Sequence, residues 1–179
     1  MVAIIIIIAI IVFAIGYVIS ISNGLNRAII KIDEANSDID VSLTKRYDVL
    51  TKMIDVVKGY AKYEQETIFK TVELRKNMTI KEKNEANELM EENMEKINVI
   101  AENYPDLKAS ENYKTLQKAI ADVEEHLQAS RRLYNANVSS YNQKIVTFPS
   151  SIIANSKGLT KKDFFTVENK KREDVKIEL

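Results

Sequence analysis

Residues 32–60, IDEANSDIDVSLTKRYDVLTKMIDVVKGY, contain the clearest evidence for a helical bundle in this chain. Their apolar side chains recur at alternating steps of three and four residues, the heptad spacing of a helix that packs along another helix. One row consists of Ile32, Ile39, Met53 and Tyr60, and the other of Leu43, Leu50 and Val57. Arg46 interrupts the first row. The pattern predicts a helix from about Leu25 to about Asn77, because Gly59 weakens a helix without ending it.

An uncharged segment, MVAIIIIIAIIVFAIGYVISI at residues 1–21, precedes this helix. At ~1.5 Å per residue it is long enough for the roughly 30 Å hydrocarbon core of a bilayer, so residues 1–22 are predicted to be a transmembrane anchor. A cleaved signal peptide is the alternative, but such a peptide carries a basic n-region and a small-x-small cleavage site, and neither is present. The spacing of Gly16, Ser20 and Gly24 would allow helix association and a homo-oligomer, or it simply marks the end of the span.

Basic residues close to the anchor lie only on its C-terminal side, beginning with Arg27 and Lys31. The single apolar segment predicts a single-pass protein of the cell membrane, and the positive-inside rule predicts its orientation. Its N-terminus is expected outside and its helical domain in the cytoplasm.

Composition restricts both the fold and the chemistry. The chain has no Cys, which excludes disulfides and Cys-based metal sites. The 26 basic residues balance the 26 acidic ones, so nucleic acid is not an expected partner. Only two Pro and four Gly occur in 179 residues, which favours helices over strands and their turns.

Two further long helices are predicted downstream. Thr79 and Glu82 form a capping box that begins the second helix, whose apolar stripe is Ala86, Met90, Met94, Ile97, Ala101 and Tyr104. Pro105 ends it, and residues 103–109 are predicted to be a loop. Ser110 is the expected cap of the third helix, whose stripe is Leu116, Ile120, Val123, Leu127, Tyr134, Tyr141 and Phe148.

Pro149 stops the third helix and is expected to open a short fourth one that ends near Gly158. The predicted fold class is all-α: an N-terminal transmembrane helix followed by an antiparallel bundle of three long helices and one short helix. The bundle is expected over residues 23–158, and residues 159–179 form a charged C-terminal tail.

Several short motifs resemble the LemA family of bacterial membrane proteins. They are NSDIDV (36–41), KRYD (45–48), VVKGYA (56–61), YPDLKA (104–109), RRLYN (131–135), YN (141–142) and FP (148–149). The resemblance implies one N-terminal transmembrane helix with its amino terminus outside, a four-helix bundle, and no established biochemical activity. The chain departs from the family pattern at Tyr63, where His is usual, and at Asn36, where an aromatic residue is common.

The residues themselves give no positive sign of catalysis. His126 is the only histidine, and Val123 stands where a di-iron bundle would need Glu. The sequence contains no phosphate-binding Gly-rich loop and no Gly-x-Ser-x-Gly elbow. We therefore predict no enzyme, no metal and no cofactor, and expect Glu124, Glu125 and His126 to form a solvated helix face.

Polar residues on or beside the apolar stripes are the candidate partner-binding or seam residues: Arg46, Glu64, Arg75, Glu124, Arg131, Asn135 and Asn142. One interpretation is that they fix helix register, as polar residues do in coiled-coil seams. The other is that a pair of them lines a cleft for a protein or a small ligand. The pairs Tyr134-Asn135 and Tyr141-Asn142, seven residues apart on one helix face, are the best candidates for such a polar ladder.

The predicted function is a non-enzymatic scaffold or adaptor that binds a protein partner at the membrane. The alternative is a ligand-responsive regulatory subunit of a membrane protease or transporter complex. A ligand that raises the melting temperature would favour the alternative, because binding to the native state alone stabilises it.

Overall fold

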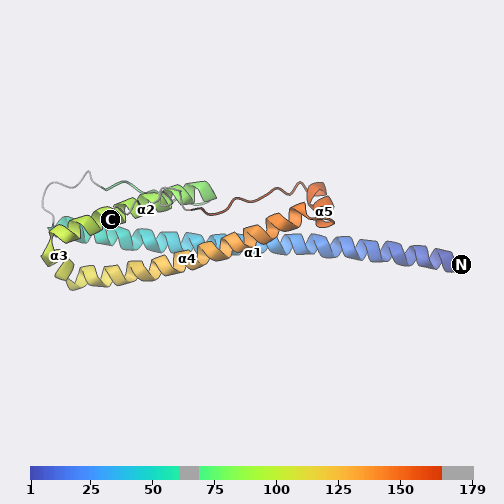
Figure 1. The fold of residues 1–179 in the computed structure, drawn as a ribbon, viewed down its shortest axis with the longest axis horizontal. Helices are drawn as coiled ribbons and strands as arrows, with labels where there is room; N and C mark the ends of the chain where they lie inside the picture. The colour runs from blue at the N-terminus through green and yellow to red at the C-terminus, as the bar shows by residue number, and fades with distance from the viewer. Residues whose placement is uncertain (61–68, 167–179) are drawn as a thin grey trace, which may run out of the picture. The chain divides into compact units, whose positions relative to one another are not determined.

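The described part of the computed structural model, residues 1–60 and 69–166, contains five helices and no strand (Figure 1). The helices are α1 (Val2–Tyr60), α2 (Ile80–Asn103), α3 (Pro105–Ala109), α4 (Glu111–Val146) and α5 (Ser150–Ser156). The all-α prediction is confirmed.

Helix α1 carries both the apolar segment and the heptad stretch without interruption (Figure 1). The side chains of residues 1–20 are all exposed, and Ile21 is the first that is even half-buried. By length and composition this part of α1 could cross a membrane. An exposed surface of consecutive isoleucines is unfavourable in water, which agrees with the predicted anchor.

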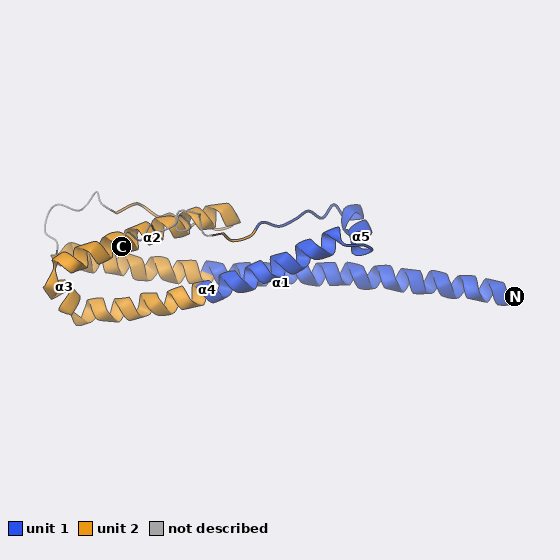
Figure 2. Ribbon diagram, in the orientation of Figure 1, with its two compact units in different colours: residues 1–40, 128–163 blue, residues 41–127, 164–179 orange. Residues whose placement is uncertain are grey.

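The chain divides into two units (Figure 2). Unit 1 consists of Met1–Asp40 and Gln128–Asp163, and unit 2 of Val41–Leu127 and Phe164–Leu179. Helices α1 and α4 each supply residues to both units, and in each unit they run antiparallel.

Each unit buries its own apolar core. In unit 1 the α1 side chains meet those of α4, together with one residue of α5; the buried residues are Leu25, Ala28, Ile32, Ala35, Ile39, Tyr134, Val138, Tyr141, Ile145 and Ala154. In unit 2 four helices contribute Leu43, Leu50, Met53, Val57, Ala86, Met90, Ile97, Ile100, Ala101, Leu107, Tyr113, Ile120, Val123 and Leu127. The predicted heptad rows of α1 are thus buried, apart from the half-exposed Tyr60.

The helix caps follow their sequence signals. Thr79 accepts a hydrogen bond from Glu82 N, and the Glu82 carboxylate accepts one from Thr79 N, as the capping box predicts. Ser110 Oγ accepts from Tyr113 N at 3.3 Å and caps α4. After α5, Gly158 has a φ of 65°, a left-handed conformation that glycine adopts without strain.

Two secondary-structure predictions are wrong. The first long helix does not extend to Asn77, because residues 69–79 are non-helical and Val72 is buried in unit 2. Residues 105–109 form α3 instead of a loop, since Pro105 suits the first turn of a helix and Leu107 buries its side chain.

Candidate functional site

The predicted polar ladder lies on α4 in unit 1 and holds a later segment of the same chain. Tyr134 donates its hydroxyl to the carbonyl oxygen of Asp163, and Tyr141 donates to that of Thr160, both at 3.0 Å. Seven residues of helix rise about 10.5 Å, and three residues of extended chain span about 10 Å, so the two spacings match. The segment therefore runs back along α4, antiparallel to it.

Asn142 adds two hydrogen bonds to the same segment. Its Nδ2 donates to the Lys162 carbonyl oxygen and its Oδ1 accepts from Lys162 N, both at 2.9 Å. With the two tyrosines it makes four hydrogen bonds to the backbone of residues 160–163, which we call the strap. Half-buried Arg131 and Asn135 lie on the same helix.

The environment of the ladder keeps Tyr134 protonated. Burial raises the pKa of Tyr134 to about 12, and the carboxylates of Asp163 and Asp33 contribute in the same direction by disfavouring a phenolate. Burial also raises the pKa of Tyr141. Both hydroxyls thus remain hydrogen-bond donors at neutral pH, as their bonds to carbonyl oxygens require.

A second polar cluster lies in unit 2, where Arg46 of α1 is buried, with 4% of its surface exposed. Its Nη2 lies 2.6 Å from Glu124 Oε1 on α4. Its Nη1 donates to Asn87 of α2, at 2.5 Å to Oδ1 and 3.1 Å to the backbone oxygen. One guanidinium therefore joins three helices, and its planar array of donors suits several acceptors at once.

A third polar contact repeats the asparagine arrangement of the strap. Asn93, buried on α2, donates Nδ2 to the Lys70 carbonyl oxygen and accepts from Lys70 N, both at 2.8 Å. Asn87 and Asn93 were missed from the sequence. Their spacing beside Ala86, Met90 and Ile97 places them on the buried face, and that spacing is the signal that could have found them.

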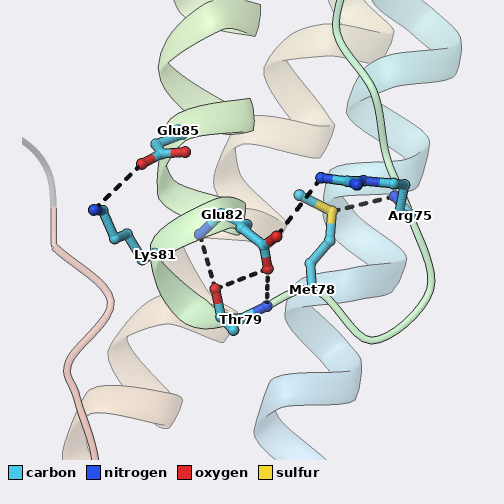
Figure 3. A network of polar contacts seen from close by, with 6 residues as sticks. All are labelled: Arg75, Met78, Thr79, Lys81, Glu82 and Glu85. Carbon is cyan, nitrogen blue, oxygen red and sulfur yellow. Dashed lines mark hydrogen bonds and ion pairs between the residues drawn. The ribbon is translucent and has the colours of Figure 1, made fainter.

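Arg75 occupies a different environment, next to the start of α2 (Figure 3). It is exposed, and its Nη2 lies 3.6 Å from Glu82 Oε1. Hydrogen bonds from the backbone and side chain of Thr79 lower the pKa of Glu82, and the positive charge of Arg75 contributes in the same direction. Figure 3 also shows Arg75 N donating to Met78 Sδ at 3.2 Å. This network stabilises the start of α2.

The predicted site residues are therefore distributed over separate clusters. In unit 2 the structure brings Arg46 and Glu124 together and places Arg75 beside Glu82; in unit 1 it places Asn142 of α4 against the strap. Glu64 lies outside the described residues. Within residues 1–60 and 69–166 no group of three or more His, Asp or Glu side chains could hold a metal ion.

The comparisons with known proteins agree with the motifs. A model of the LemA family matches residues 35–179. The chain is 31% identical over 158 residues to "Protein LemA" of Metamycoplasma hominis, a match that covers 86% of this chain and 72% of that protein. It is 27% identical over 66 residues to "Magnetosome protein MamQ" of Magnetospirillum gryphiswaldense, which covers 37% of this chain and 24% of MamQ. The chain therefore belongs to the LemA family.

Proposed function

We propose that this protein is a non-enzymatic scaffold, anchored in the cell membrane by α1, whose helical bundle presents an exposed surface to a protein partner. The main observation in favour of the proposal is that polar groups in the helix seams bond to other parts of the same chain. Arg46 and Asn142 each have their bonding capacity directed at other parts of the same chain. Groups bound in this way hold helices and the strap in register, as polar seam residues do in coiled coils.

The surface left for a partner is the outer face of the helices. On the part of α4 that belongs to unit 1, this face includes the exposed side chains of Gln128, Arg132 and Gln143. A photoreactive amino acid at each of these positions in the full-length protein would capture a partner in intact cells. The scaffold proposal requires that one partner protein be captured from these positions and not from exposed Glu95 on α2. The same partner must also bind the purified scaffold.

Self-crosslinks alone from these positions would count against a dedicated protein partner. They would instead support a homo-oligomer as the functional form.

We further propose that the bundle faces the cytoplasm and the amino-terminal side of α1 faces outside. Support comes from Arg27 and Lys31, the basic residues that follow the apolar segment. Because the chain has no cysteine, an Asn23→Cys variant carries a single thiol, at an exposed position just after that segment. A membrane-impermeant maleimide should label it in permeabilised cells and leave it unlabelled in intact cells; labelling in intact cells would reverse the orientation.

A second function, a ligand-responsive regulatory subunit, is favoured by one observation. The strap is bound to the ladder through backbone groups, and a ligand with similar acceptors could take its place on Tyr134 and Tyr141. A small molecule that raises the melting temperature of wild type but not of a Tyr134→Phe variant would support this function.

A further inference from the structure

The corner between α4 and α5, residues 146–152 in unit 1, carries exposed apolar side chains. The predicted place of Phe148 in the apolar stripe of the third long helix is wrong: α4 ends two residues before it, and its side chain is 77% exposed. Ile152 and Val146 are 61% and 58% exposed. Three large apolar groups on one short corner form a surface that water solvates poorly. Their surroundings in unit 1 indicate what covers them.

A hydrogen bond between α1 and α4 shows which residues of α1 lie beside this corner. Asn137 Nδ2 donates to the Lys31 carbonyl oxygen at 2.9 Å. Because the two helices are antiparallel, each step along α4 beyond Asn137 is a step along α1 toward the apolar segment. Helix α4 ends at Val146, nine residues beyond Asn137 and therefore at about the level of Ser22, and Phe148 follows two residues later.

Two further contacts support this register. Lys157, just after α5, donates Nζ to Ser22 Oγ at 2.5 Å and to Asn26 Oδ1 at 3.3 Å. A surface pocket of about 270 Å³ is lined on α1 by Gly24, Arg27, Ala28 and Lys31, and on α4 by Asn137, Ser140 and Lys144. Lys144 thus lies at the level of Gly24, three residues beyond the apolar segment.

That level coincides with the edge of a bilayer spanned by α1. Val2–Ile21 measures about 30 Å as a helix, which equals the thickness of the hydrocarbon core. Ser20 then lies at the boundary between acyl chains and headgroups. Residues 24–31 lie within about 15 Å of Ile21 along the helix, and the first of them lie in the headgroup layer.

The charge around the corner has a single sign. Residues 22–32 and 137–162 contain no acidic residue, and their basic residues are Arg27, Lys31, Lys144, Lys157, Lys161 and Lys162. The balanced net charge of the whole chain conceals this local excess. Basic side chains beside exposed apolar ones are typical of surfaces that lie in the interface of an anionic membrane.

We propose that the α4–α5 corner is a second membrane contact: Phe148 and Ile152 enter the bilayer interface, while Arg27, Lys31 and Lys144 bind the phosphate groups of anionic lipids. The proposal rests on the membrane anchoring of α1 put forward under Proposed function. Continuity with the apolar segment and complementary charge identify the occupant as the bilayer itself. The contact would hold the bundle at a fixed height and orientation on the membrane.

The chain has no tryptophan, so a single substituted tryptophan reports its own environment. We would place full-length Phe148→Trp in nanodiscs of phosphatidylcholine and phosphatidylglycerol whose acyl chains are brominated near the glycerol backbone. The matched control is Leu133→Trp, because Leu133 is 51% exposed on α4, the helix that leads to the corner. It lies about 20 Å along α4 from Val146, where the helix ends and the corner begins. Ile8→Trp, within the apolar segment, reports whether that segment lies in the bilayer.

The expected result is a blue-shifted emission for Phe148→Trp, quenched several-fold more than that of Leu133→Trp. If Phe148→Trp matches Leu133→Trp while Ile8→Trp is quenched, the corner does not touch the bilayer and the anchor stands. If Ile8→Trp is not quenched, both the anchor and the corner contact are wrong.

The lipid charge tests the basic part of the contact. Quenching of Phe148→Trp should fall when phosphatidylglycerol is replaced by phosphatidylcholine, and when Arg27→Gln and Lys144→Gln are added. The control pair, Lys114→Gln and Lys118→Gln on the α4 part of unit 2, should have no effect. If the quenching changes neither with lipid charge nor with the Arg27→Gln and Lys144→Gln substitutions, the proposal that these side chains bind lipid phosphate groups is wrong.

Discussion

The side-chain amide of Asn142 pairs with both backbone groups of Lys162, accepting from its N–H and donating to its carbonyl oxygen at 2.9 Å. Asn93 pairs with Lys70 in the same way at 2.8 Å. In each unit, an asparagine on a helix thus pairs with the backbone N–H and carbonyl of an extended segment, as a neighbouring strand would do. A planar amide can do so because its donor and acceptor have the spacing of a peptide group.

Replacing Asn142 should loosen the strap. Asn142→Ala removes two hydrogen bonds from a half-buried position, and we expect it to destabilise the protein by about 1–2 kcal/mol. Trypsin should then cleave faster after Lys161 and Lys162, which limited proteolysis followed by mass spectrometry would detect.

Asn155→Ala, at an exposed position on α5, is the matched control and should leave cleavage unchanged. Equal protection of the strap in Asn142→Ala and wild type would show that the asparagine does not hold it.

Glu124 is the more exposed partner of the Arg46–Glu124 ion pair, and yet removing it should lower the free energy of unfolding more than removing Arg46. Glu124→Ala leaves the buried guanidinium with Asn87 alone, and we expect a loss of about 3 kcal/mol. Arg46→Met removes the buried charge and fills the space, while the Glu124 carboxylate, 43% exposed, regains water. We expect a loss of only about 1 kcal/mol.

A double-mutant cycle in chemical denaturation measures the coupling. The double variant should be about as stable as Arg46→Met. Glu85→Ala, which breaks an exposed pair with Lys81, is the control and should cost at most about 0.5 kcal/mol. A larger loss for Arg46→Met than for Glu124→Ala would contradict this assignment of the buried charge.

The capping box at the start of α2 should depend on pH. Thr79→Ala should cost about 1 kcal/mol at neutral pH, and Thr79→Ser much less, because serine also caps. The pKa of Glu82 is lowered from 4.5, so its contribution is present above that pH and is lost as the pH falls through the folded pKa.

Thr79→Ala keeps the backbone N–H that donates to the Glu82 carboxylate, so the pH test uses Glu82→Ala. The stability difference between wild type and Glu82→Ala should shrink in acid, as urea midpoints at neutral and acidic pH would show. A difference that is independent of pH would mean that the Glu82 half of the box adds nothing.

The sequence predicted the parts of the fold that local rules govern. The heptad rows, the caps at Thr79 and Ser110, and the stop at Pro149 all depend on residues close together in the chain. The prediction that this helix continues to Asn77 was wrong at Lys70, whose backbone N–H and carbonyl bond to the side chain of Asn93, 23 residues farther along the chain. A distant side chain that replaces a helical bond leaves no local signature.

The same limit applies to the candidate site. The sequence predicted a ladder of the pairs Tyr134-Asn135 and Tyr141-Asn142, because helical spacing places them on one face. Tyr134, Tyr141 and Asn142 bind the strap. The sequence did not identify this partner, since the charged residues 159–163 have no apolar periodicity of their own. The ladder binds the backbone of this segment, and backbone groups are the same whatever the side chains are.

Tyr134 should make the protein less stable in strong alkali. Its pKa is about 12 in the folded protein and about 10 in the unfolded chain, where the phenol is hydrated. Between these values the unfolded chain has lost the proton and the folded protein still holds it. Stability should therefore fall as the pH rises from about 10 to about 12, and Tyr134 should have no such effect below about pH 10.

The test compares the urea midpoints of wild type and Tyr134→Phe at neutral pH and near pH 11.5, with exposed Tyr60→Phe as the control. Tyr134→Phe removes the titrating hydroxyl and its bond to Asp163, so it should be less stable at neutral pH by about 1 kcal/mol. In alkali it should lose less stability than wild type or Tyr60→Phe, because phenylalanine has no proton to release. Equal losses in all three proteins would show that the Tyr134 hydroxyl is not held in its protonated form by the fold.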